Sequence, residues 1–186
     1  SWMKTITAMN YAHAIRIAEE LIRDEGYDNF IFPSNLVRLA KMNQFIVVAL
    51  SRCPSFILEI YGKMFYFDHI LGAEWIVSDG LFSGIVSNPG IFEDKKNQLI
   101  DCLRGRTYRI DFEGSISIGD TQKDTEWMDL FGHRIAFNPD APLLVHARDN
   151  LMSYTVVHEH KDVVICPQHE DIVSPQELAQ YCMSIL

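Results

Sequence analysis

The sequence predicts an α/β fold in which helices cover both faces of a mainly parallel β-sheet, giving a three-layer sandwich. Helix-like and strand-like segments alternate along the 186 residues with short connections, a pattern typical of parallel sheets. The runs "FIVVALS" at 45–51 and "GSISIG" at 114–119 are apolar, as expected for strands buried on both faces. A third segment, "EWIVSDGLFSGIV", breaks the rhythm because Asp79-Gly80 favours the tight turn of a β-hairpin. We expect this hairpin to project from the sheet.

Local patterns predict the remaining elements in order. Residues 11–24 form an amphipathic helix whose apolar side chains share one face, namely Ala14, Ile17, Ala18, Leu21 and Ile22. Pro33 opens a second helix at 33–42, and Pro54 opens a third after the first strand. Further helices are expected at 93–103, 125–131, 140–150 and after Ser174, and further strands at 133–138, 154–157 and 162–166.

Composition indicates one globular domain over residues 1–186, and it excludes two classes of partner. A net charge of −9 and a pI of about 5.1 argue against nucleic-acid binding, which needs clustered Lys and Arg. No apolar run approaches the roughly 20 residues of a membrane-spanning helix. The 4 cysteines form no CxxC pair, so we expect reduced thiols and a cytoplasmic location.

Polar side chains that follow the buried strands are the first candidates for a functional site, because ligands bind beyond the carboxyl ends of parallel strands. Ser51 and Asn138 each follow one strand, and Asp120 follows another. Ser51 precedes a helix start, so its hydroxyl and the free amides of that helix favour a phosphate ligand, with an ordinary helix cap as the alternative. Gly119 permits a sharp exit from its strand, and Asp124 comes one turn after Asp120. Two carboxylates at one strand end suit Mg²⁺, with a capping and a surface aspartate as the alternative.

Two lysines open the helix before the strand that delivers Asp120. An ammonium group at Lys95 or Lys96 would neutralise a transferring phosphoryl group, although a lysine pair alone is usually solvated surface. The order of features is more informative than any one of them: a hydroxyl after a strand, a lysine at a helix start, and GDxxxD after the next strand.

This order resembles the haloacid dehalogenase (HAD) superfamily, in particular its phosphoserine-phosphatase-like branch, and the likeness covers most of the chain. "FIVVALSRCPSFILEIYGKMF" is similar to the second family motif, which implies that Ser51 binds the transferring phosphoryl group. "EDKKNQLIDCL" is similar to the third, with Lys96 preferred over Lys95 as its lysine. "ISIGDTQKDTEWMDLFGHRIAFNP" is similar to the fourth, which implies that Asp120 binds Mg²⁺ directly and that Asp124 supports it. The resemblance also implies a Rossmann-like core.

The chain departs from the family at its first motif. That motif, DxDx(T/V), supplies the aspartate nucleophile and the acid/base aspartate, and no DxD occurs in the 186 residues. In the family it ends the central strand, between the strand leading to Ser51 and the strand leading to Asp120. We therefore expect the chain to be a C-terminal portion of a larger protein or a degenerate relative. Residues 1–44 would be the return from a missing cap, and 45–186 the core.

The leading hypothesis is a Mg²⁺-dependent phosphomonoester hydrolase acting on a small phosphorylated metabolite, with residues 1–186 alone inactive. The resemblance implies attack by an aspartate outside this chain, followed by hydrolysis of the aspartyl-phosphate. A second hypothesis is a catalytically silent HAD-like domain that acts as a binding or partner module. A third is a flavodoxin-like or receiver-type domain with acidic residues at its strand ends. Substrate identity and oligomeric state are not readable from the sequence.

Overall fold

The computed structural model describes residues 7–25, 30–104, 106, 109–150, 153–160, 163–165, 172–173 and 175–186. The chain divides into two compact units, each described here by itself. Unit 1 comprises Ser1–Asn29 and Gln44–Asp101, and unit 2 comprises Phe30–Asn43 and Cys102–Leu186. No helix in the described ranges is long and apolar enough to cross a membrane.

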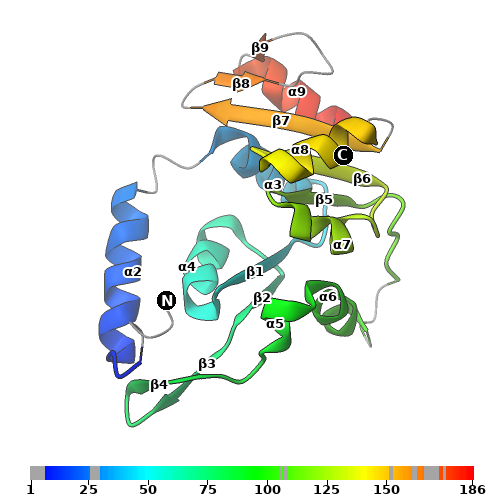
Figure 1. The fold of residues 1–186 in the computed structure, drawn as a ribbon. Helices are drawn as coiled ribbons and strands as arrows, with labels where there is room; N and C mark the ends of the chain where they lie inside the picture. Colours follow the sequence, from blue (N-terminus) through cyan, green and yellow to red (C-terminus); the bar gives the residue numbers. More distant parts are fainter. Residues whose placement is uncertain are drawn as a thin grey trace. The chain divides into compact units, whose positions relative to one another are not determined.

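Unit 1 is built on a parallel β-α-β element. Its secondary structure is α2 (Tyr11–Glu25), β1 (Val48–Pro54), α4 (Ser55–Phe65), β2 (His69–Ala73), β3 (Trp75–Ser78), β4 (Leu81–Val86), α5 (Gly90–Glu93) and most of α6 (Lys95–Leu103). β1 and β2 pair in parallel and are joined by α4 (Figure 1). β3 and β4 form the predicted antiparallel hairpin, and both residues of its turn have positive φ, 50° at Asp79 and 77° at Gly80, as a tight hairpin turn requires.

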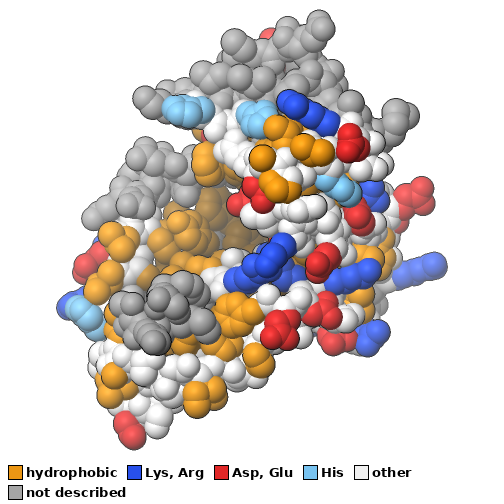
Figure 2. All heavy atoms as spheres, viewed as in Figure 1, with side chains coloured by type: hydrophobic (Ala, Val, Ile, Leu, Met, Phe, Trp, Pro, Cys, Tyr) orange, Lys and Arg blue, Asp and Glu red, His pale blue; other side chains and the backbone are white. Residues whose placement is uncertain are grey.

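The core of unit 1 lies where α2, α4, α5 and the hairpin meet. Its buried members are Ala14, Phe56, Ala73, Trp75, Phe82 and Ile91. The predicted apolar face of α2 is only partly covered, since Ala14 and Ile22 are buried but Leu21 is 53% exposed. Hydrophobic side chains are visible along α2 and the hairpin in Figure 2.

Unit 2 is the three-layer sandwich that the sequence predicts. Its elements are α3 (Ile31–Met42), β5 (Ile116–Gly119), a 3₁₀ turn η1 (Gln122–Asp124), α7 (Thr125–Met128), β6 (His133–Phe137), α8 (Ala141–Asp149), β7 (Tyr154–His160), β8 (Val163–Ile165), β9 (Ile172–Val173) and α9 (Pro175–Ile185). The sheet order is β5-β6-β7-β8-β9. β5, β6 and β7 are parallel, and β8 and β9 add antiparallel. α3 and α9 cover one face, and α7 and α8 the other (Figure 1).

The face of the sheet beneath α3 and α9 forms the main core of unit 2. Its buried members are Phe32, Leu36, Leu39, Ile135, Phe137, Val157 and Cys182, with Ile116 and Ile118 packed against them. Successive residues of β5 point to opposite faces, because Ser117 faces α7 and its hydroxyl lies 3.4 Å from the carbonyl oxygen of Met128.

Most predicted elements are confirmed, and the differences concern the ends of elements and short strands. The strand expected at 45–51 is β1 at Val48–Pro54, which continues to the residue before α4. The helix expected at 125–131 ends as α7 at Met128, after a 3₁₀ turn that was not predicted. β2 and β9 were missed because both are short and depend on pairing with distant strands. Ser174, after which the last helix was expected, lies outside the described residues.

A buried carboxylate fixes the start of α3. Glu159, at the end of β7, is 5% exposed, and its Oε2 accepts a hydrogen bond of 2.9 Å from the backbone N–H of Phe32. Its Oε1 accepts from the N–H of Ile31. The backbone of Glu159 is held in turn by Asn138, whose side chain donates to its carbonyl oxygen at 3.1 Å and accepts from its N–H at 2.8 Å. Asn138, a candidate site residue, thus joins the end of β6 to β7. Its backbone is in the left-handed region, with φ 43°.

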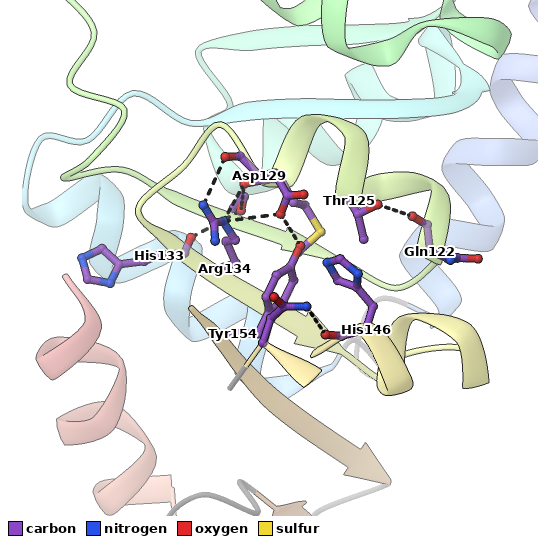
Figure 3. A network of polar contacts seen from close by, with 10 residues as sticks. Gln122, Thr125, Asp129, His133, Arg134, His146 and Tyr154 are labelled. Carbon is purple, nitrogen blue, oxygen red and sulfur yellow. Dashed lines mark hydrogen bonds and ion pairs between the residues drawn. The ribbon is translucent and has the colours of Figure 1, made fainter. Parts of the chain in front are cut away.

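On the opposite face, a polar network joins α7, β6, β7 and α8 (Figure 3). The hydroxyl of Tyr154 donates to Asp129 Oδ1 at 2.9 Å. Arg134 donates to the carbonyl oxygens of Met128 and Asp129, at 3.3 and 3.1 Å, and its guanidinium lies 5.7 Å from the centre of the Tyr154 ring. The His146 ring meets the Tyr154 ring edge-on. Burial, and next the bond to Asp129, raises the pKa of Tyr154.

Replacing Glu159 by Ala should loosen α3 from the sheet. The N–H groups of Ile31 and Phe32 would lose a charge-assisted acceptor in a buried place, which costs about 1 to 3 kcal/mol. We expect the free energy of unfolding in urea to fall by that amount, with faster amide exchange in α3. The exposed Glu113→Ala is the matched control and should change little. Equal stability of the two variants would contradict the role of Glu159.

Tyr154→Phe tests the polar network through its pH dependence. Because the pKa of Tyr154 is raised in the folded state, its stabilising contribution is complete below about pH 10, the ordinary tyrosine value, and is lost as pH rises through the folded pKa. At pH 7 the variant should lose about 0.5 to 1.5 kcal/mol for the missing hydrogen bond. Above about pH 10 the difference from wild type should shrink, as measured by urea unfolding. Tyr61→Phe is the control, and a pH-independent difference would refute the expectation.

Candidate functional site

The loop after β5 carries both Asp120 and Asp124. β5 ends at Gly119, whose register partner in β6 is Ala136. Asp120 follows directly and is exposed, while η1 turns the chain so that Asp124 packs back against the strand end. A Cβ atom on residue 119 would lie 2.9 Å from Asp124 Cβ and 2.7 Å from the sulfur of Met128. Glycine is therefore required there by close packing.

The carboxylate of Asp124 is engaged from within the loop. Asp124 is 3% exposed, and its Oδ2 accepts from the backbone N–H and the hydroxyl of Thr121, at 3.2 and 3.0 Å. Its Oδ1 accepts from the indole N–H of Trp127 at 3.2 Å. Thr121 and Asp124 form a capping box around η1. With these donors in place, Asp124 fits a supporting role better than that of a direct metal ligand.

Asp140 is a further residue at this loop, and the sequence reasoning missed it. It caps α8, with its Oδ1 accepting from the N–H of Leu143 at 2.8 Å. The same carboxylate oxygen lies 3.2 Å from the N–H of Gln122 in the loop. An aspartate two residues before Pro142 is a helix-start signal, so the pattern in the sequence could have found the cap. It could not have found the contact with Gln122.

Ser51 lies in unit 1, in the middle of β1 rather than after it, because the strand continues to Pro54 and α4 begins at Ser55. It is partly buried, and its Oγ accepts from the N–H of Cys53 at 3.1 Å. The Nε atom of the neighbouring Arg52 is buried without a hydrogen-bond partner in the described part of the chain. A hydroxyl and an unsatisfied guanidinium N–H therefore sit on adjacent residues. Burial raises the pKa of Cys53, which keeps its thiol protonated and argues against a nucleophilic role.

Lys95 and Lys96 are the first two residues of α6, as expected, in the same unit as Ser51. Lys95 is partly buried and Lys96 is exposed. Asp94 caps this helix, because its Oδ1 accepts from the N–H of Asn97 at 2.9 Å. The first turn of α6 thus carries two ammonium groups next to a capping carboxylate.

The oxygen-rich chemistry of the β5 loop fits a hard cation such as Mg²⁺. In the described ranges no group of three or more His, Cys, Asp or Glu side chains is arranged to hold a metal ion. Mg²⁺ does not need such a group, since it keeps several waters and takes one or two carboxylates together with substrate phosphate. Asp120, exposed at the strand end, fits the part of the direct ligand.

Comparisons with known proteins identify the fold. No family model matches the sequence, and no curated protein sequence matches it. A protein of unknown function from Bordetella pertussis Tohama I matches with a TM-score of 0.66 and 16% identity, over 82% of this chain and 70% of that one. A HAD family hydrolase from Salmonella enterica subsp. enterica serovar Typhi matches with a TM-score of 0.58 and 14% identity, over 75% of this chain and 46% of that one.

A phosphoserine phosphatase, solved as an analogue of its phospho-aspartyl intermediate, matches with a TM-score of 0.54 and 18% identity. The match covers 80% of this chain and 61% of that one. The chain therefore spans only part of the length of these two hydrolases. At such low identities the likeness concerns the fold, and the chain has the Rossmann-like α/β core fold of HAD-family hydrolases and phosphoserine phosphatases.

Proposed function

We propose that this chain is the phosphate-binding and metal-binding portion of a HAD-type, Mg²⁺-dependent phosphomonoester hydrolase that acts on a small phosphorylated metabolite. The observation that carries the proposal is the loop after β5. It carries Asp120 at the carboxyl end of a parallel strand and holds the Asp124 carboxylate through Thr121 and Trp127. The sequence order of Ser51, the lysine pair and GDxxxD supports the same function.

In this proposal the cationic and the acidic side chains have separate roles. Ser51 and Lys96, or Lys95, bind the phosphoryl oxygens. Asp120 holds Mg²⁺, and Asp124 supports it through the loop. The bound ion would offset the charge of the phosphoryl oxygens. A chain with a net charge of −9 needs such local cations to bind an anion.

The nucleophile has to come from outside residues 1–186. We propose that a strand carrying DxDx(T/V) supplies it, attacking phosphorus to give an aspartyl-phosphate that water then hydrolyses. The strand order supports this. Within the described residues, β1 pairs only with β2, and β5 lies at the edge of the five-stranded sheet. β5 is nevertheless covered on both faces, since Ser117 is 3% exposed and Ile116 and Ile118 pack in the core.

A silent HAD-like partner module is the second candidate, favoured by the lack of any DxD in the 186 residues. Either protein would work in a reducing compartment such as the cytoplasm, which is consistent with the free thiols of Cys53, Cys102 and Cys182.

Asp120→Asn separates these two functions. The intact parent protein, with any segment encoded upstream, should hydrolyse p-nitrophenyl phosphate only with Mg²⁺, and the variant should lose about 100-fold or more of kcat/KM. Asp149→Asn, an exposed charge at the far end of α8, is the control and should retain activity. Residues 1–186 alone should show no turnover. Equal rates for wild type and Asp120→Asn would contradict a metal-binding role of Asp120. A parent protein without activity would favour the silent module.

Alanine replacements at Lys95 and Lys96 decide which lysine binds the phosphoryl group. We expect Lys96→Ala to lower kcat/KM of the parent by about 100-fold, and Lys95→Ala to have a small effect, because an electrostatic donor to the phosphoryl oxygens is worth that much. Lys96→Arg should recover part of the loss. The reverse pattern would assign the role to Lys95, and two unimpaired variants would remove the helix from the site.

A further inference from the structure

Asp140 joins two loops that both follow strands of unit 2. It stands between β6 and α8, where its Oδ1 accepts from the N–H of Leu143 at 2.8 Å and so begins the helix. The same carboxylate accepts from the N–H of Gln122, at 3.2 Å to Oδ1 and 3.4 Å to Oδ2. Gln122 is the first residue of η1 in the loop after β5. One side chain therefore serves the starts of two helical segments.

The backbone of Asp140 adds a second link to the same loop. Its N–H donates to the carbonyl oxygen of Asp120 at 2.8 Å. Asp140 is thus bonded to the residue before Thr121 and to the residue after it. Thr121 itself is held from the other side, where its N–H and hydroxyl donate to Asp124. Each of the three consecutive residues from Asp120 to Gln122 therefore has a backbone group that is hydrogen-bonded to Asp140 or to Asp124.

The carboxylate of Asp140 is oriented as an acceptor of N–H groups. Both of its contacts come from the first turns of helical segments, where orphan N–H groups and the positive end of the α8 dipole stabilise a negative charge. This arrangement separates Asp140 in role from Asp120, whose carboxylate is exposed at the strand end.

From this geometry we infer that Asp140 is a positioning residue for the metal ligand Asp120. The inference rests on the proposed function, because it assigns Asp140 to the same metal site. By fixing the backbone on both sides of Thr121, Asp140 sets the direction in which the Asp120 side chain leaves the strand end. Residues that orient a metal ligand typically change metal affinity by 10- to 100-fold when they are replaced.

The test measures metal affinity and loop geometry in the full chain of 186 residues. Mn²⁺ is titrated in place of Mg²⁺, and its binding is followed by electron paramagnetic resonance and by paramagnetic broadening of the Thr121 and Gln122 amide signals. Asp140→Ala should weaken Mn²⁺ binding by about 10-fold or more, and the proton signal of the Gln122 amide should move upfield as its acceptor is lost. Asp140→Asn keeps an oxygen acceptor and should recover most of both effects.

Controls separate this role from general stability and from the proposed function. Asp149→Ala removes an exposed charge from the other end of α8 and should leave Mn²⁺ affinity unchanged. Equal affinity of Asp140→Ala and wild type, with both folded by circular dichroism, would overturn the positioning role and leave the metal site standing. No Mn²⁺ binding by wild type would overturn the metal site and the role of Asp140 in it. An unmoved Gln122 signal in a folded Asp140→Ala would show that the Gln122 N–H does not donate to the Asp140 carboxylate.

Discussion

A buried carboxylate is stable only where hydrogen bonds replace the water that it loses, and Glu159 meets this requirement with the first two N–H groups of α3. The bond joins residues 127 positions apart in the chain. It assigns α3 to the sheet of unit 2, where Phe32 and Leu36 fill the space above Phe137 and Val157. Without α3 that face of the sheet would expose its apolar side chains to water.

The covered sheet in turn determines where the candidate metal loop begins. β5 has four residues, Ile116–Gly119, and its place is fixed by parallel pairing with β6 and by Ile118 packing in the α3 core. Gly119 is the last residue of the strand, and a Cβ atom there would lie too close to Asp124 and Met128. On the other face, Arg134 and Tyr154 hold the end of α7 through Asp129. Both faces of the sheet thus restrain the two ends of the η1-α7 segment.

Local signals were enough to predict much of this arrangement, and non-local pairing accounts for what they missed. The apolar run of β5, the Asp79-Gly80 turn and the helix after Asp140 each depend on residues close in sequence, and each is present. The short β2 has no strong pattern of its own and exists through its parallel pairing with β1. Glu159 gave no signal, because its partners Ile31 and Phe32 are backbone groups far away in the chain. No local pattern encodes such a cap.

The same limit explains which part of the candidate site could be predicted. Asp120, Asp124 and Asp140 carry the same carboxylate, and their surroundings separate their roles. Asp124 is buried with donors from Thr121 and Trp127, both three residues away, so the hydrogen bonds behind its proposed supporting role follow from spacing within the loop. Asp140 accepts from Gln122, which lies 18 positions away, and spacing could not reveal that contact. Asp120 is the exposed member of the set. The N–H and O–H donors around Asp124 and Asp140 belong to the protein itself, so both carboxylates hold the loop that carries Asp120.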